Sequence, residues 1–234
     1  MALVKCPDCG RDVSTRAEAC PNCGCPSKYF PGRASTLGVG DTFNFGRWGG
    51  QEIEWRVLEL LDGLALLIAK QGIDCKPYHY TRTSATWADS LLRLWLNAEF
   101  LQGAFDDAER AKIIQTRVAN PDDPKGGGTE GTATVDKLFC LSTGEALRYF
   151  GSDADRVCYP TPHAKARGVW TDNAGACRWW LRSPRSFGIT AQYVDVDGRI
   201  DMDGVGITRT TLCVRPAMYL RLSPDLRSIE QEQP

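Results

Sequence analysis

The sequence predicts an α+β fold preceded by a small metal-binding module. Two C-x2-C pairs stand near the N-terminus, before a segment in which apolar and polar residues alternate. Apolar residues then recur every three to four positions, and alternation returns after residue 168. Alternation is the period of a half-buried strand, and the longer step is that of an amphipathic helix. The resulting order, β-β-α-α-β-α followed by a run of short strands, is that of an α+β domain.

The bulk composition narrows the class of protein. The chain has 234 residues, 42% of them apolar, and a net charge of −1. This length allows one large domain with a small appendage. The near-neutral charge gives no reason to expect nucleic acid or an acidic membrane as a partner. There is no apolar run of about 18 residues and no signal-peptide core, so we expect a cytoplasmic location and no membrane span.

The N-terminal module reads CPDCGRDVSTRAEACPNCG over residues 6–24. Each C-P-x-C-G unit is expected to form a tight knuckle, because its glycine can adopt positive φ and backbone N–H groups then point at the thiolate. Two knuckles bring four sulfur ligands together in the tetrahedral arrangement that suits Zn²⁺. Two disulfides would instead require an oxidising compartment, which nothing else indicates. The predicted structural zinc ligands are Cys6, Cys9, Cys20 and Cys23, with Cys25 as a spare thiol.

This segment resembles the short zinc ribbons at the N-termini of many bacterial and archaeal proteins. A module this small has no core without metal, so zinc binding and its folding are expected to be one event. Residues 1–33 hold five Lys/Arg against three Asp/Glu, with no dense basic stripe. We therefore expect a structural role or the docking of a partner rather than nucleic-acid binding.

The chain is expected to divide into four parts. The zinc ribbon covers residues 1–26, and residues 27–36 form a linker that contains Pro, Gly and Ser without periodicity. The large domain covers residues 37–222. Residues 223–234 are expected to be a flexible tail.

The first half of the large domain predicts a hairpin and then a helix. Residues 53–58 and 64–69 read as strands joined by a turn at Asp62–Gly63. The stretch SATWADSLLRLWLNAEFL has helical period, with Ser84 or Thr86 as its N-cap.

Further elements follow along the chain. A second helix is expected to start at Asp106–Asp107, where the acidic first turn suits the helix dipole, and to include Ile113 and Ile114. Residues 120–134 are expected to form a long irregular loop. Residues 138–141 read as a strand, and Ser142 as the cap of a helix that runs to Phe150. After residue 168 we expect short strands and no helix.

The stretch DVDGRIDMDG, residues 195–204, carries aspartates at alternate positions, as a calcium loop does. An EF-hand needs Gly at position 6 and Glu at position 12, and neither register of this stretch meets both conditions. Calcium is therefore not the expected ligand. The alternation predicts a hairpin with Asp197–Gly198–Arg199 as a three-residue loop. The inward residues would be Val194, Val196, Ile200 and Met202, and the outward ones Asp195, Arg199, Asp201 and Asp203.

Several motifs occur in order through the large domain. The end of the domain reads W-W-L-R-S-P … A-x-Y-V … D-G-x-I … V-R-P-A-M, and EIEWRVLEL, DCKPY, LRLWLN, NPDDPK and DKLFCLS precede it. Together they resemble an uncharacterised bacterial domain family, over about residues 37–222. That family resembles C-type-lectin-like folds, which include formylglycine-generating-enzyme-like domains.

This resemblance implies a fold and a function. The fold would be C-type-lectin-like, with short antiparallel strands and two or more helices. Some proteins with such folds are the variable proteins of diversity-generating retroelements, in which reverse transcription mutates adenines in a C-terminal repeat, often at AAC codons. The implied function is to display a diversified surface on a fixed β scaffold. The implied partner is a protein or another macromolecular ligand.

Residues 185–213 are compatible with such an origin. Adenine changes in AAC codons cannot give Lys, Glu, Gln, Met or Trp. Between Arg185 and Cys213 only Gln192 and Met202 lie outside the reachable set, and we assign both to the scaffold. The residues implied for the variable surface are Arg185, Ser186, Phe187, Ile189, Thr190, Asp195, Arg199, Asp201, Asp203, Val205, Ile207, Thr208, Arg209 and Leu212.

A fixed scaffold is expected beneath that surface. Its core residues would be Trp179, Trp180, Val194, Ile200, Val214 and Pro216. Arg182 and Arg215 are expected to hold loop carbonyls or carboxylates rather than ligand. The exposed mixture of Arg, Asp, Phe, Ile and Thr resembles a paratope, in which adaptable polar groups stand beside a few apolar anchors.

Two other functions stay open. The relation to formylglycine-generating enzymes suggests a cysteine oxidase, for which Cys177 and Cys213 would have to meet across the sheet. No C-x-x-C lies in the large domain, and His79 and His163 occupy loop-like segments. No Ser-His-Asp order, P-loop or HExxH is visible, so we expect no catalytic residue and no enzyme. In the third hypothesis the zinc ribbon recruits a partner and the lectin-like domain senses a ligand.

Overall fold

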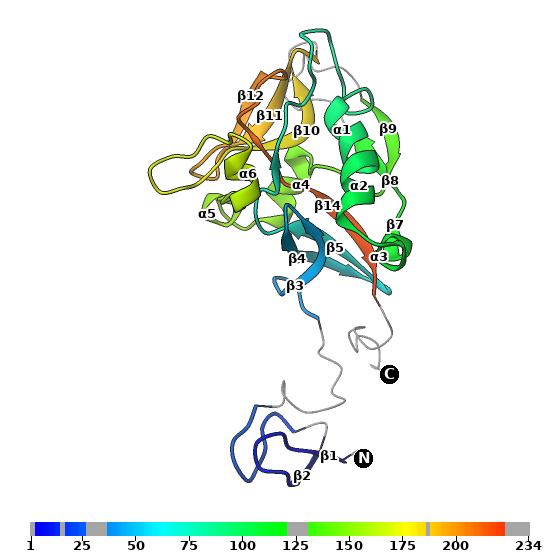
Figure 1. Ribbon diagram of the computed structural model, residues 1–234, viewed down its shortest axis with the longest axis vertical. Coiled ribbons are helices and arrows are strands. Elements are labelled where there is room, and N and C mark those ends of the chain that lie inside the picture. Colours follow the sequence, from blue (N-terminus) through cyan, green and yellow to red (C-terminus); the bar gives the residue numbers. More distant parts are fainter. Residues whose placement is uncertain (1–2, 15–16, 27–36, 121–130, 186–187, 223–234) are drawn as a thin grey trace. The chain divides into compact units, whose positions relative to one another are not determined.

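The computed structural model describes residues 3–14, 17–26, 37–120, 131–185 and 188–222 (Figure 1). The chain forms two compact units, a smaller one that holds the N-terminal residues up to Gly38 and a larger one from Val39 to Arg221. The predicted linker, residues 27–36, and the predicted tail, residues 223–234, lie outside the described residues. None of the described helices has the length and apolar character needed to cross a lipid bilayer.

The smaller unit contains one two-stranded antiparallel sheet. Strands β1 (Leu3–Lys5) and β2 (Asp12–Ser14) pair with Val4 opposite Val13. The buried residues of this unit are Cys6, Val13, Cys20 and Cys25. Three of these four are cysteines, so the described part of this unit offers very little apolar area to drive folding.

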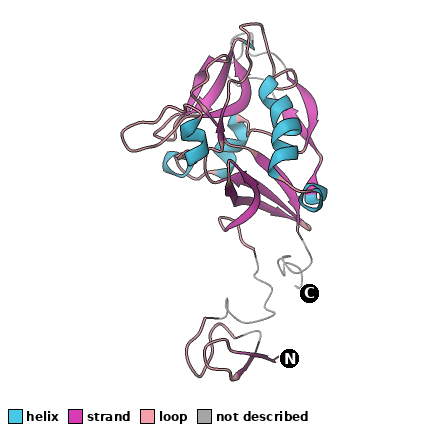
Figure 2. Cartoon of the chain, in the orientation of Figure 1, coloured by secondary structure: helices cyan, strands magenta, loops and turns pink. Residues whose placement is uncertain are grey.

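The larger unit is a mixed α+β structure, as predicted, with two five-stranded sheets (Figure 2). In order across the first sheet, the strands are β3 (Thr42–Trp48), β4 (Gln51–Leu61), β5 (Leu64–Ala69), β14 (Ala217–Arg221) and β7 (Ile113–Ile114). Across the second sheet they are β12 (Ile200–Gly206), β11 (Thr190–Val194), β10 (Trp179–Arg185), β13 (Cys213–Val214) and β6 (Asp74–Cys75). All neighbouring strands are antiparallel except β10 and β13.

Short helices and a two-stranded ribbon complete the larger unit. The ribbon pairs β8 (Thr116–Asn120) with β9 (Gly131–Asp136). The helices are α1 (Leu91–Trp95), the π-helical η2 (Leu96–Phe100), α2 (Leu101–Ala104), α3 (Asp107–Lys112), α4 (Thr143–Tyr149), α5 (Asp153–Arg156) and α6 (Pro162–Ala166). In Figure 1, α1 and α2 follow one another along one line beside β8 and β9.

The predicted β4–β5 hairpin is confirmed, with Leu61 paired to Leu64 around the Asp62–Gly63 turn. Gly63 has a φ of 70°, a conformation that glycine adopts without steric cost. The middle strand β5 is nearly all buried, because β4 and β14 flank it and both of its faces are covered.

The first helix starts later than predicted. Its N-cap is Ser90, whose Oγ accepts a hydrogen bond from the Arg93 N–H, and not Ser84 or Thr86. The residues before it are held elsewhere: the backbone N–H of Ala85 donates to the Gly188 carbonyl, and the Trp87 indole donates to Asp136. Long-range hydrogen bonds therefore compete with the first predicted turn of helix.

The second helix ends earlier than predicted. Asp106 caps α3 and forms a capping box with Glu109, but α3 stops at Lys112. Ile113 and Ile114 form strand β7 instead, because they pair with Leu220 and Tyr219 at the edge of the first sheet. Tertiary pairing thus overrides a helical period that was real but short.

Of four further expectations, two differ from the structure and two are confirmed. Thr116–Asn120 and Gly131–Asp136 pair as β8 and β9, so both ends of the predicted 120–134 loop are strands, and residues 121–130 lie outside the described part. Residues 138–141 form no strand, since only Phe139 makes a bridge, to Ala217. Helix α4 is confirmed, with Ser142 as N-cap and Phe150 as C-cap. The described residues after 168 contain no α-helix, as expected.

Candidate functional site

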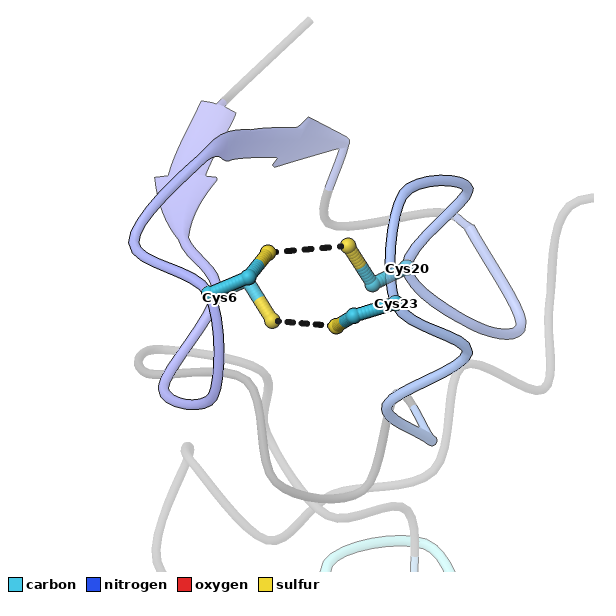
Figure 3. Close-up of side chains that lie close together, drawn as sticks. Cys6, Cys20 and Cys23 are labelled. Atoms are coloured by element: carbon cyan, nitrogen blue, oxygen red, sulfur yellow. Dashed lines mark hydrogen bonds between the residues drawn. The ribbon is translucent and has the colours of Figure 1, made fainter.

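The four predicted metal ligands come together in the smaller unit. The Sγ atoms of Cys6, Cys9, Cys20 and Cys23 all lie within 4.8 Å of one another. The Cys6 and Cys23 sulfurs are 3.6 Å apart, and so are those of Cys9 and Cys20. Figure 3 shows the Cys6, Cys20 and Cys23 side chains pointing toward one another from opposite knuckles. Metal–sulfur bonds of about 2.3 Å in a tetrahedron require sulfurs about 3.8 Å apart, so a tetrahedral ion fits.

The knuckles fold as the sequence indicates. Gly10 and Gly24 have φ of 70° and 75°, and their N–H groups donate to the Cys6 and Cys20 carbonyls. Hydrogen bonds from the Arg11 backbone and then from the Asn22 side chain lower the pKa of Cys9 to about 6. These hydrogen bonds favour the thiolate of Cys9, which is the form that binds a metal.

Cys25 lies outside this group of four and has a different role. It is buried in the small core of the unit, and its carbonyl accepts a hydrogen bond from the Cys20 N–H at 2.8 Å. The chain here forms an isolated bridge between Ala19 and Pro26. Cys25 thus helps to close the second knuckle without being one of the four clustered sulfurs.

In the larger unit, Arg182 and Arg215 are almost completely buried, and their guanidinium groups hold the backbone of other segments. Arg182 donates to the carbonyls of Ala119 and Cys140, at 2.7 and 2.9 Å, and forms an ion pair with Glu145. These bonds tie the ribbon strand β8 and the start of α4 to β10.

Arg215 makes the same kind of contact elsewhere. Its Nε donates to the Ala69 carbonyl at 2.9 Å and its Nη1 to the Arg156 carbonyl at 3.2 Å. Its guanidinium also lies over the ring of Trp179, at 4.9 Å from the centroid. Both arginines therefore make contacts of the type that the sequence predicts.

The apolar scaffold residues are mostly buried. Trp179, Trp180, Val194, Val214 and Pro216 lie in the core, whereas Ile200 is only half-buried. The indole of Trp180 donates to the Lys76 carbonyl, and that of Trp179 to the Arg156 carbonyl. Six consecutive residues of β10 are buried, because both faces of this strand are covered.

The predicted variable residues divide into two groups. Ile189, Arg199, Asp203 and Arg209 are exposed; Arg185, Thr190, Asp195, Asp201, Val205 and Thr208 are half-buried. Ile207 and Leu212 are buried, at 0% and 2% exposure, so the expectation that they lie on the surface is wrong. Ile207 anchors its loop, since its N–H donates to Ile189 and its carbonyl accepts from His79. Ser186 and Phe187 lie outside the described residues.

A cavity of about 750 Å³ opens beside β11 and β12. The described residues that line it are Arg82, Ile189, Thr190, Val205, Gly206, Thr208 and Arg209. Six of these seven belong to the 185–213 segment. Arg82, which lies between β6 and α1, was not predicted as a site residue, and no local pattern around it marks it as one.

The hairpin of residues 195–204 has its loop one residue earlier than predicted. Val194 pairs with Ile200, and the Asp195 N–H donates to the Arg199 carbonyl. The Gly198 N–H donates to the Asp195 carbonyl, and Gly198 has a φ of 83°. The three-residue loop is therefore 196–198, because its glycine takes the last, left-handed position of the turn.

This shift changes which side chains are inward. Val194 is buried, but Val196, Ile200 and Met202 are only half-buried, and the buried Gln192 and Tyr193 are neighbours in sequence. A register shift between Ala191 and Tyr193 breaks the alternation. The predicted separation into an inward apolar row and an outward acidic row therefore holds only in part.

The aspartates of this hairpin bind groups of their own chain. The Arg178 Nε and the Val196 N–H donate to Asp195, and the Tyr193 hydroxyl donates to Asp201 at 2.9 Å. The Arg199 N–H donates to Asp197 at 3.1 Å. A shallow groove of about 410 Å³ runs along these carboxylates.

The proposed thiol pair of the oxidase hypothesis is deeply buried. Cys177 and Cys213 both have 0% exposure. Hydrogen bonding to Cys158 lowers the pKa of Cys177, but a hydrogen bond to Cys213 and burial outweigh it and the pKa is raised. The pKa of Cys213 is also raised, since burial outweighs its hydrogen bond to Cys177. These are the properties of packed thiols rather than of reactive thiolates.

The two histidines also lie in unequal surroundings. His163 belongs to helix α6, not to a loop, and its Nε2 is 3.4 Å from the buried carboxylate of Asp74. The Trp48 indole donates to the same carboxylate oxygen at 2.9 Å. The Nδ1 of His79 is buried and has no hydrogen-bond partner within the described part of the chain.

A family model matches most of this chain. The model described as "Domain of unknown function (DUF6273)" matches residues 62–222. The chain belongs to this family. Comparisons of the chain with curated proteins and with solved structures find no match. The match begins at the turn of the β4–β5 hairpin, so β3 and β4 precede it although they belong to the same sheet.

Proposed function

We propose that the larger unit is a ligand-binding scaffold with a C-type-lectin-like fold, and that it is the variable protein of a diversity-generating retroelement. Residues 185–213 would carry the diversified surface and bind a protein ligand. The observation that carries this proposal is the composition of the cavity beside β11 and β12, because six of its seven described lining residues come from that segment.

The division between fixed and variable positions also supports the proposal. Positions that would have to stay constant, such as Trp179, Trp180 and Arg182, are buried and hold other segments. Ile189, Thr208 and Arg209 line the cavity without a core role. A diversified surface needs such positions, because substitutions there leave stability nearly unchanged.

For the smaller unit, we propose a structural Zn²⁺ held by Cys6, Cys9, Cys20 and Cys23, with partner docking as its role. Zinc prefers four thiolates in a tetrahedron and has no redox chemistry of its own in this setting. The bound ion would supply most of the folding free energy of this unit, since its described core has so few apolar residues.

The coding sequence and the protein each offer a test. At the gene, we expect a neighbouring reverse-transcriptase gene and a near-repeat of codons 185–213 that differs at template adenines; their absence would remove the diversification part. At the protein, we expect Ile189, Thr208 and Arg209 to tolerate simultaneous substitution, with a change in unfolding free energy of about 0.5 kcal/mol or less per site in urea unfolding.

A matched control is the buried loop residue Ile207, which lies in the same segment. Ile207→Thr buries a hydroxyl in an apolar site and should cost about 1–3 kcal/mol. Equal costs at the cavity positions and at Ile207 would contradict the proposed separation between displayed and fixed residues.

A further inference from the structure

We propose that the cavity beside β11 and β12 binds an acidic segment of a partner protein, with Arg82 and Arg209 as the carboxylate-binding groups. This inference deepens the proposed ligand-binding function and rests on it. It adds a chemical class for the ligand and a binding residue, Arg82, from outside the 185–213 segment.

The charges around the cavity point to a carboxylate. Arg82 and Arg209 are both exposed, and neither forms an ion pair with a carboxylate of the described residues. None of the described residues that line the cavity is acidic. By contrast, Arg178 and Arg148 elsewhere on the unit are paired with Asp195 and Glu59, at 2.9 and 2.8 Å. Two unpaired guanidinium groups at one cavity favour an anionic group, which they can bind through bidentate hydrogen bonds.

The backbone around the cavity is held in place before any ligand arrives. The His79 N–H donates to the Ile207 carbonyl at 2.9 Å, and the Ala85 N–H donates to the Gly188 carbonyl at 3.0 Å. These two bonds lie on either side of Arg82 in the sequence and join its segment to the 185–213 segment. The Arg209 N–H donates to the Gly206 carbonyl at 3.0 Å. Such ordering lowers the conformational cost of binding.

The size and apolar content of the cavity suit part of a peptide. Its volume of about 750 Å³ lies within the range of about 300–1,000 Å³ that is usual for ligand sites. Ile189 is 48% exposed, and Val205 is half-buried beside it in the lining. An acidic side chain could bind the arginines while a neighbouring apolar side chain covers these two residues.

The surrounding charges favour a protein over a nucleic acid. Asp201 and Asp203 lie on β12, the same strand that supplies Val205 and Gly206 to the cavity, and they line the adjoining groove. The chain as a whole carries a net charge of −1. A polyanion would bring further phosphates against these carboxylates, whereas a peptide needs only one or two acidic residues at the arginines.

The test is selection from a random peptide display library on the full chain, followed by fluorescence anisotropy. The probes are a selected peptide, the same peptide with each Asp and Glu replaced by Asn and Gln, and a labelled single-stranded DNA. We expect the selected sequences to be enriched in Asp and Glu, and the neutral counterpart to bind about a hundredfold more weakly. Arg82→Gln and Arg209→Gln should each weaken binding about tenfold, because each removes a charged hydrogen-bond donor.

Arg47→Gln is the matched control, since Arg47 is an exposed arginine on β3 outside the cavity. It should leave binding unchanged, and all three variants should keep the thermal midpoint of the full chain. Each of three results would overturn the proposal. The selected peptides are not enriched in Asp and Glu, the double variant Arg82→Gln/Arg209→Gln binds the selected peptide as tightly as the wild type does, or the DNA binds more tightly than the peptide. If the gene has no near-repeat but acidic peptides still bind through both arginines, this inference stands. Only the proposed diversification is then contradicted.

Discussion

In the larger unit, the cost of burying a polar group and the pKa of a buried thiol depend on the groups that surround them. Arg182 is a charged residue at 2% exposure, and it is tolerated because three of its contacts are carbonyl or carboxylate acceptors on Ala119, Cys140 and Glu145. An unpaired charge at that depth would cost several kcal/mol. The sequence can indicate that this arginine is structural, but the acceptors come from segments about 40 to 60 residues away and are visible only in the fold.

Cys140 allows a prediction about alkaline pH. Burial raises the pKa of this thiol from 9.0 to about 12. The folded state therefore binds the thiol proton more tightly than the unfolded state, so its contribution is fully present below pH 9.0 and is lost as pH rises toward about 12. For this one group, the free energy of unfolding should fall by about 1.4 kcal/mol per pH unit in that window.

The measurement is urea unfolding of the wild type and of Cys140→Ala across this pH window. Cys140→Ala should lose this part of the slope. Leu141→Ala is the matched control, because Leu141 is also fully buried but has no titratable group, so it should be less stable at every pH and keep the slope. Equal slopes in Cys140→Ala and Leu141→Ala would show that the thiol does not titrate differently on folding.

Among the structural elements, the two cysteine knuckles are the ones whose folding we expect to depend most on a bound metal. The described core of the smaller unit has Val13 and three cysteines, and only one pair of three-residue strands accompanies it. Burial of so few apolar groups does not offset the conformational entropy of folding. A metal bound by the four thiolates would supply the missing free energy.

A chelator should therefore unfold the smaller unit and leave the larger one intact. All seven tryptophans of the chain lie in the larger unit, at positions 48, 55, 87, 95, 170, 179 and 180. Their near-UV circular dichroism should stay unchanged, while trypsin cleaves after the exposed Arg11 faster and zinc is released. Cys9→Ser should abolish zinc binding, whereas Cys25→Ser should retain it. A smaller unit that stays protected from trypsin in chelator would contradict this prediction.

The two hairpins differ in how completely the sequence predicts them. The β4–β5 turn at Asp62–Gly63 is specified locally, because alternating strands and a turn glycine agree on one register. In the 195–204 hairpin the loop type was predicted, but its position was off by one residue. The carbonyl oxygen of Asp153 would lie 1.8 Å from a Cβ at position 198, so α5 approaches this turn and only glycine fits there.

For the molecule as a whole, the family match and the folded unit begin at different residues. The match starts at residue 62, whereas the larger unit starts at Val39 and includes β3 and β4. Strand β4 buries Trp55 and Val57 completely, and the Trp55 indole donates to the Phe45 carbonyl on β3. Without these two strands, β5 would be an uncovered edge next to an exposed apolar face.

Two fragments of the chain should show which of these two starting points is the start of the cooperatively folding unit. A chain of residues 39–222 should unfold cooperatively at the same temperature as the larger unit in the full chain. A chain of residues 62–222 should show no cooperative transition and weak near-UV circular dichroism from its tryptophans. Thermal unfolding followed by circular dichroism measures both, and a cooperative transition of the 62–222 chain would mean that β3 and β4 are not part of the core.

The sequence by itself determined the cluster of four cysteines, the α+β class, the β4–β5 hairpin and the capped helix α4. Each of these follows from short-range patterns, such as C-x2-C spacing, alternation, a turn glycine and a capping serine. Only the tertiary structure decided that Ile113 and Ile114 are a strand, that Ile207 and Leu212 are buried, and that Arg82 joins the cavity of the 185–213 segment. The physical reason is that pairing and burial depend on partners far away in the chain, which a local pattern does not contain.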